Sequence, residues 1–153
     1  MRIFLAWAAM TTAAFAQTFG AWQLNPGRST LSGSVAPRSL VLRIEPHRKG
    51  EILTVDTVET DGRRTSSSSI LYLDGTPRDF QDLQCSGTQT SRRLDSQTVE
   101  ILRQCGSGKW IRFIRRSSAN RNELVLEVTE QNSDGRRFER RLMLEKQGRE
   151  KDK

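Results

Sequence analysis

Residues 123–145 read ELVLEVTEQNSDGRRFERRLMLE, and this segment predicts an antiparallel β-hairpin. In its first half Leu124, Leu126 and Val128 alternate with Val, Glu and Thr, so an extended strand has one apolar and one largely polar face. Ser133-Asp134-Gly135 then supplies a turn, because Asp and Gly tolerate the backbone conformations of tight hairpins. A second run that continues to residue 145 forms the partner strand.

The same alternation recurs along the chain in short runs bounded by turn residues, and no segment after residue 16 has a convincing helical period. The candidate strands are 20–25, 39–45, 51–58, 65–73, 78–83, 88–94, 98–104, 109–116, 123–131 and 136–145. Residues 26–38 form a connection that can hold a lid or short helix. We therefore predict an all-β fold, an antiparallel up-and-down β-barrel of eight to ten strands whose closure removes the free edges.

The N-terminus has the features of a secretory signal peptide. Met1-Arg2 precedes an apolar run, and small residues end in the A-x-A site Ala14-Phe15-Ala16. The alternative, a permanent membrane anchor, needs about 20 apolar residues, and this run is shorter. No Cys follows the site to accept a lipid. We expect a cleaved leader over 1–16 and a secreted or periplasmic mature chain from Gln17, with no stable membrane anchor.

Removing residues 1–16 from the 153 leaves 137, the size of one domain. We assign 17–147 to a single β-barrel domain and 148–153 to a charged flexible tail. The formal net charge is +7, and most basic residues are Arg, which suits anionic partners. The alternative is that these Arg side chains simply solvate the outer face of the sheet.

Cys85 and Cys105 are predicted to form a disulfide, because thiols normally pair in an oxidising compartment. A hairpin folded about Asp95 places these two positions opposite one another. Closing the loop stabilises the fold by roughly 3 kcal/mol in the chain-entropy model. Metal ligation lacks a neighbouring His, and a redox pair normally has C-x-x-C spacing.

Several short motifs resemble those of lipocalins. The principal one is Gly20-Ala21-Trp22, similar to the lipocalin G-x-W signature at the start of the first strand. The others are Leu24-Asn25-Pro26 with Ser29, Tyr72-Leu73-Asp74-Gly75, Asp95 with Thr98-Val99-Glu100, and Leu144-Glu145-Lys146. Together they look like small secreted bacterial lipocalin-like proteins of the calycin superfamily, and they cover most of 19–147.

The resemblance implies structural roles for Gly20, Trp22 and an arginine. In lipocalins the Trp closes one end of the barrel and an Arg near the last strand packs over it, a role that Arg140 or Arg141 can fill here. The related fatty-acid-binding proteins carry R-x-Y on the last strand to hold a carboxylate. Alignment on Glu145 puts Leu142 and Leu144 at those positions, which argues against direct transfer of fatty-acid binding.

No constellation in the sequence supports catalysis, so we predict a non-enzymatic protein without a cofactor. The sole histidine, His47, lies in a turn with no nucleophile pattern nearby. Asp56, Glu59 and Asp61 are better explained as an exposed polar edge than as a catalytic carboxylate pair. We find no metal-ligand cluster, P-loop or dinucleotide fingerprint.

A barrel of eight or more strands can enclose one small molecule, so the leading hypothesis is binding of a small apolar or amphipathic ligand by a monomer. Strand phase suggests Arg140, Phe138, Phe113 and Trp110 as ligand-binding residues, with Arg140 alternatively stacked on Trp22. The second hypothesis is a binding or inhibitor module for an anionic glycan, lipopolysaccharide, protein or nucleic acid. Its candidate anchors are Arg63-Arg64, Arg92-Arg93, Arg115-Arg116 and Arg136-Arg137.

Overall fold

The computed structural model describes residues 18–32, 35–83 and 85–148. The predicted leader and almost all of the predicted tail lie outside these residues. Strands in the described chain are β1 (Gly20–Leu24), β2 (Ser39–His47), β3 (Gly50–Val58), β4 (Arg64–Leu71), β5 (Arg78–Gln81), β6 (Ser86–Arg93), β7 (Thr98–Cys105), β8 (Trp110–Ser117), β9 (Glu123–Gln131) and β10 (Arg137–Lys146). One 3-10 turn, η1 (Pro26–Arg28), lies in the connection after β1.

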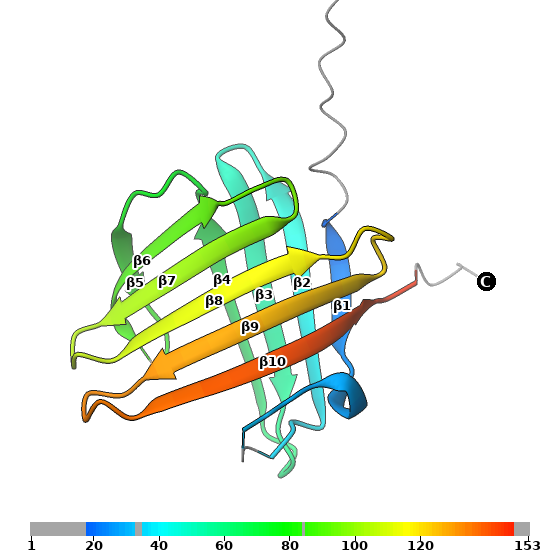
Figure 1. Ribbon diagram of the computed structural model, residues 1–153, viewed down its shortest axis with the longest axis horizontal. Helices are drawn as coiled ribbons and strands as arrows, with labels where there is room; N and C mark the ends of the chain where they lie inside the picture. The colour runs from blue at the N-terminus through cyan, green and yellow to red at the C-terminus, as the bar shows by residue number, and fades with distance from the viewer. Residues whose placement is uncertain (1–17, 33–34, 84, 149–153) are drawn as a thin grey trace, which may run out of the picture.

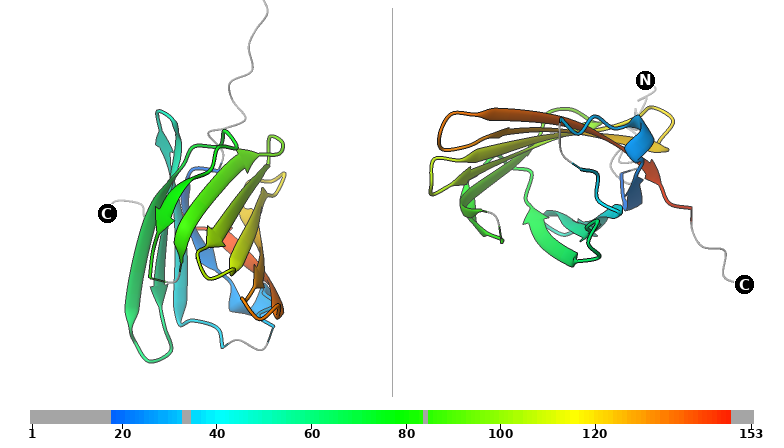
Figure 2. Two further views of the ribbon diagram at one scale, coloured as in Figure 1. Left: turned by 90° about the vertical axis from the view of Figure 1, so that its left-hand side faces the viewer. Right: turned by 90° about the horizontal axis from the view of Figure 1, so that it is seen from below.

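All ten strands belong to one antiparallel sheet in the order β4-β3-β2-β1-β10-β9-β8-β7-β6-β5. Consecutive strands are therefore neighbours except β4 and β5, and β1 joins the N-terminal and C-terminal strands by pairing with both β2 and β10. The sheet curls around a concave inner face, as the view from below shows (Figures 1 and 2). The predicted all-β, up-and-down antiparallel fold is confirmed.

The predicted closure of the sheet is incomplete, because β4 and β5 are edges that do not pair with each other. After β4 the chain turns onto β6 instead: the Leu73 amide donates to Ser91 Oγ at 3.0 Å, and the Gly75 amide donates to the Ser91 carbonyl at 2.9 Å. An isolated bridge joins Asp74 to Arg92. These bonds hold the start of the β5 segment against β6, and a gap remains beside β4.

Apolar side chains on the inner face make one core. The alternation seen in the sequence directs Leu124, Leu126 and Val128 inward, and all three are buried. Trp22 is fully buried, and its indole Nε1 donates to the Thr18 carbonyl at 3.0 Å. It lies in the core where β1 pairs with both β2 and β10.

The predicted disulfide is confirmed. Cys85 and Cys105 are joined, with their Cα atoms 5.2 Å apart. The register pairs Gly87 with Cys105, so the hairpin is centred on Ser96, one residue after the predicted Asp95, and Cys85 is not directly opposite Cys105. The pairing of β6 with β7 nevertheless brings the two cysteines together. The bond fixes the loop between β5 and β6 to the end of β7.

Candidate ligand cavity

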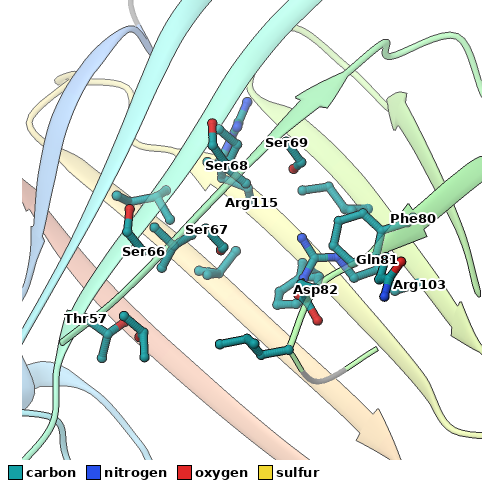
Figure 3. Close-up of a pocket in the computed structure, with 18 residues that line it drawn as sticks. Thr57, Ser66, Ser67, Ser68, Ser69, Phe80, Gln81, Asp82, Arg103 and Arg115 are labelled. Atoms are coloured by element: carbon teal, nitrogen blue, oxygen red, sulfur yellow. The ribbon is translucent and has the colours of Figure 1, made fainter. Parts of the chain in front are cut away.

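A cavity of about 550 Å³ lies on the concave face of the sheet, between the β3–β4 wall and the β7–β9 wall (Figure 3). Its lining residues are Leu42, Leu53, Val55, Thr57, Thr65, Ser66, Ser67, Ser68, Ser69, Phe80, Gln81, Asp82, Leu83, Ile101, Arg103, Phe113, Arg115 and Leu126. The lining includes residues on both edges of the gap between β4 and β5. The cavity therefore reaches the surface at this gap, where Leu83 is 93% exposed.

The walls of the cavity differ in chemistry. Six aliphatic or aromatic side chains from β2, β3, β7, β8 and β9 form an apolar wall: Leu42, Leu53, Val55, Ile101, Phe113 and Leu126. On the other wall lie Thr57 on β3 and Thr65, Ser67 and Ser69 on β4, whose side chains share the inner face with Val55. Ser66 and Ser68 also border the cavity, but their hydroxyls bond to Asp56 and Thr54 on the opposite face. The cavity thus offers apolar contact on one side and hydrogen-bonding groups on the other, beside the gap.

Arg103 crosses the cavity between two aromatic rings. Its guanidinium carbon lies 4.1 Å from the centroid of Phe80 and 5.1 Å from that of Phe113. Nε donates to Gln89 Oε1 at 2.9 Å, and Nη1 lies 3.3 Å from Asp82 Oδ2. Burial lowers the pKa of this guanidinium and the charge of Asp82 opposes that effect. Arg103 therefore already has an anionic partner and a stacked position.

Arg115 forms a buried ion pair at the base of the cavity. Its Nη1 lies 2.5 Å from Glu51 Oε1, and both side chains are 2% exposed. The angles at this contact are poor for hydrogen bonding: among the described residues, neither Nη1 nor Nη2 of Arg115, nor Oε1 of Glu51, has a hydrogen-bond partner. The pair is therefore shielded from solvent, and the charge of each side chain is balanced by the other.

A third cation lies near this pair. Burial lowers the pKa of Arg93; the charge of Glu51 raises it, and the charge of Arg115 lowers it. Arg93 is at the end of β6, is partly exposed and does not line the cavity. Its charge is consequently better screened by solvent than that of Arg115.

The four predicted ligand-binding residues do not come together. Phe113 lines the cavity. Trp110 is three residues before Phe113 and therefore points to the opposite face of β8. The guanidinium carbon of Arg137 lies 5.7 Å from the centroid of its ring. Phe138 and Arg140 share the inner face with Leu142 but lie outside the cavity lining; Phe138 is 42% exposed, and Arg140 pairs with Glu130 at 3.4 Å.

The arginine expected over Trp22 is replaced by a lysine. Lys146 is the β10 residue in register with Trp22, and its Nζ lies 5.3 Å from the ring centroid. Arg140 is six residues away along the strand, about 20 Å, and is in register with Val128. Arg141 points to the outer face and bridges Thr30 through its backbone. The predicted packing of either arginine on Trp22 is wrong.

Comparison with known proteins supports the fold. No protein-family model and no curated protein matches the sequence. Among solved structures, the Schistosoma mansoni fatty acid binding protein in complex with arachidonic acid aligns with a TM-score of 0.57 over 88% of this chain and 99% of that chain, at 9% identity. The fold is calycin-like. At this identity the likeness concerns the fold alone.

Sequence reasoning missed the two arginines that line the cavity of this calycin-like fold. Arg115 was a candidate surface anchor together with Arg116, but it is fully buried, so that prediction is wrong for Arg115. The signal was its phase: Arg115 alternates with Ile111 and Phe113, which face the core. Arg103 is likewise in phase with Ile101 on β7.

On the outer face of the calycin-like sheet, arginines are compensated by carboxylates. Glu100 accepts hydrogen bonds from Arg92 Nε at 2.6 Å and Arg112 Nε at 2.7 Å. Burial opposes ionisation of Glu100, but the bonds from Arg112 and Arg92 prevail and lower its pKa. Arg116 pairs with Glu127 at 2.7 Å. Each of these three arginines therefore contacts a carboxylate on the same face.

Two classes of feature are missing from the part of the chain that the structure describes. It holds no cluster of three or more His, Cys, Asp or Glu side chains suited to a metal ion. It also has no helix that is long and apolar enough to cross a membrane.

Proposed function

We propose that the protein binds one small apolar or amphipathic molecule in the cavity of its curled sheet. The observation that carries this proposal is the cavity itself, about 550 Å³ in volume, with an apolar wall and a small number of convergent polar groups. Ligand pockets in proteins typically measure about 300–1,000 Å³ and have this kind of lining.

The structural neighbour adds support at the level of architecture. That protein was solved with arachidonic acid, a long-chain amphiphile. This chain lacks the R-x-Y pair on its last strand, where buried Leu142 and Leu144 stand instead. Any polar group of a ligand must therefore be recognised elsewhere in the cavity.

Filling the cavity is expected to abolish binding. Ser67 lies on the edge strand β4 opposite Val55 and lines the cavity, so Ser67→Trp places an indole in the ligand space without removing core packing. We expect at least a tenfold loss of affinity for N-phenyl-1-naphthylamine, a neutral dye whose fluorescence rises in apolar surroundings. Fluorescence titration measures this loss.

The matched control is Thr129→Trp, which puts the same side chain on the outer face of β9 opposite Arg112. It is expected to bind the dye within twofold of the unmodified protein. If the unmodified protein bound no dye, or if Ser67→Trp bound it as well as Thr129→Trp, the proposed function would be refuted.

We also propose that the protein acts outside the cytoplasm, in the periplasm or the exterior, after cleavage between Ala16 and Gln17. The A-x-A site and the disulfide support this proposal, because disulfides persist mainly in oxidising compartments. Intact-mass analysis of the protein recovered from the periplasm or medium should give a chain that begins at Gln17. Recovery of the chain only from the cytoplasm, with its leader intact, would contradict export.

A further inference from the structure

We infer that the gap between β4 and β5 is a docking site for the extended C-terminal segment of another polypeptide, which adds a strand to β4 and ends beside Arg63 and Arg64. This role goes beyond the proposed function, because the occupant is a peptide and the contact is a sheet edge. Three features of the structure lead to it: an unpaired edge, cavities along the gap, and two exposed cations at one end.

The edge of β4 has backbone groups that point into the gap. In the turn before β4 the Glu59 amide donates to the Arg63 carbonyl at 2.8 Å, so these two residues form a hydrogen-bonded pair. Such pairs alternate along an antiparallel ladder, so Ser66, Ser68 and Ile70 direct their N–H and C=O groups away from β3. Among the described residues β4 pairs with β3 alone, so an extended chain in the gap can bond to these groups.

β4 also lacks the features that usually protect a free edge. Residues 65–70 include no charged side chain and no proline, and their register with β3 is unbroken. Six of the eight residues of β4 are exposed. The other free edge, β5, has only four residues. β4 is therefore the edge on which a partner strand fits.

Space for side chains of an added strand is available along the gap. The ligand cavity borders one part of it, where Figure 3 shows the serines of β4 on one side and residues 80–82 on the other. A second cavity, of about 570 Å³, lies farther along the gap beside Ile70 and Tyr72. Ser68, Ser69 and Phe80 line both cavities. A chain running along β4 therefore passes both, and its inward side chains meet the apolar wall of the ligand cavity.

The surroundings of the gap favour a single extended segment over a second copy of this chain. Residues 80–83 lie across the cavity from residues 66–69. In a second copy β4 has β3 on its other side, and that β3 would overlap residues 80–83. A lone peptide segment brings no neighbouring strand with it.

Arg63 and Arg64 determine which end of the segment lies near them. Both residues are exposed, and neither side chain has an ion-pair partner among the described residues. Antiparallel pairs are slightly more stable than parallel ones, and antiparallel addition brings the C-terminal end of the segment to the start of β4. A free carboxylate at that end meets two guanidinium groups whose geometry suits carboxylates.

The test uses an array of eight-residue peptides attached through their amino ends, so that each has a free C-terminus, with every position varied among Val, Leu, Phe, Ser and Thr. Peptides with apolar residues at alternate positions are expected to bind. The strongest binder, made in solution, is expected to lose at least tenfold in affinity when its C-terminus is amidated, and to slow hydrogen exchange at Ser66, Ser68 and Ile70. Absence of any binder, or equal affinity of acid and amide, would overturn this role of the gap.

Two substitutions at one position separate the backbone from the side chain. Ser68→Pro removes an amide that points into the gap and no backbone bond to β3, so we expect at least tenfold weaker peptide binding. Ser68→Ala removes only the hydroxyl and is expected to bind within twofold of the unmodified protein. Equal binding by the two variants would contradict strand addition.

If Ser68→Pro does not fold, N-methylation of single amides of the peptide tests the same bonds on the unmodified protein. Methylation is expected to weaken binding at least tenfold at every second residue and less than twofold at the residues between, because only alternate amides of an added strand face β4. A uniform effect would contradict strand addition. Dye titration of the unmodified protein reports the proposed function separately, so either result can fail without the other.

Discussion

Arg115→Ala is expected to lower the free energy of unfolding by about 3–5 kcal/mol, because it leaves the carboxylate of Glu51 buried without its cation. Both side chains are almost completely shielded from water, so solvent cannot take the place of the lost partner. Chemical denaturation followed by circular dichroism measures the change.

The neighbouring residue supplies a matched control. Arg116 lies on the same strand but on the outer face, and its pair with Glu127 is about half exposed to solvent. Arg116→Ala is expected to cost at most about 1 kcal/mol. The double variant Arg115→Met/Glu51→Leu is expected to be near the unmodified stability or above it, since it removes both charges together. A loss below about 1 kcal/mol for Arg115→Ala would show that water reaches Glu51.

Trp22→Ala is expected to cost about 3–5 kcal/mol of unfolding free energy. Trp22 is 0% exposed and joins β2 and β10 through the pairing of β1 with both strands. The substitution leaves a large cavity in the core beside β1 and an unsatisfied carbonyl at Thr18. Thermal unfolding monitored by circular dichroism reports the loss.

A second tryptophan provides the comparison. Trp110 lies on the outer face at the beginning of β8, where the guanidinium of Arg137 covers its ring. Trp110→Ala is expected to change stability by less than half as much as Trp22→Ala. Equal losses for the two variants would mean that the complete burial of Trp22 contributes no more to stability than the outer-face contact of Trp110.

The strands and the disulfide could be predicted from sequence because both depend on local patterns. Alternation such as Leu124, Leu126 and Val128 fixes which residues face inward, whatever the long-range pairing is. The hairpin about Asp95 needs only the spacing of Cys85 and Cys105. Each of these inferences uses a pattern within about 20 residues of sequence, where turn chemistry determines the register.

Features that depend on long-range register were not predictable in the same way. The lysine over Trp22 is set by the pairing of β1 with β10, which no local pattern encodes. The gap beside β4 arises because residues after β4 bond to Ser91 on β6. An open cavity and a filled core both require inward apolar residues, so only the three-dimensional structure distinguishes them.

The buried ion pair of Arg115 and Glu51 could not be predicted from residue type alone. Arginine is usually exposed, so Arg115 in the run Arg115-Arg116 resembles one of two surface cations. Its partner Glu51 is 64 positions earlier, at the start of β3, and nothing in the spacing links them. Adjacent residues on a strand point to opposite faces, so one of the two arginines must face inward, but the identity of its partner depends on the curling of the sheet.

Native mass spectrometry of the mature protein purified from the compartment in which it acts tests the central claim most directly. Our account predicts a one-to-one complex with a small molecule, released on denaturation and identified as an apolar or amphipathic compound, or an apo protein that takes up one dodecanol when titrated. A protein that is recovered empty and remains empty in the presence of excess dodecanol and apolar dye would contradict the account.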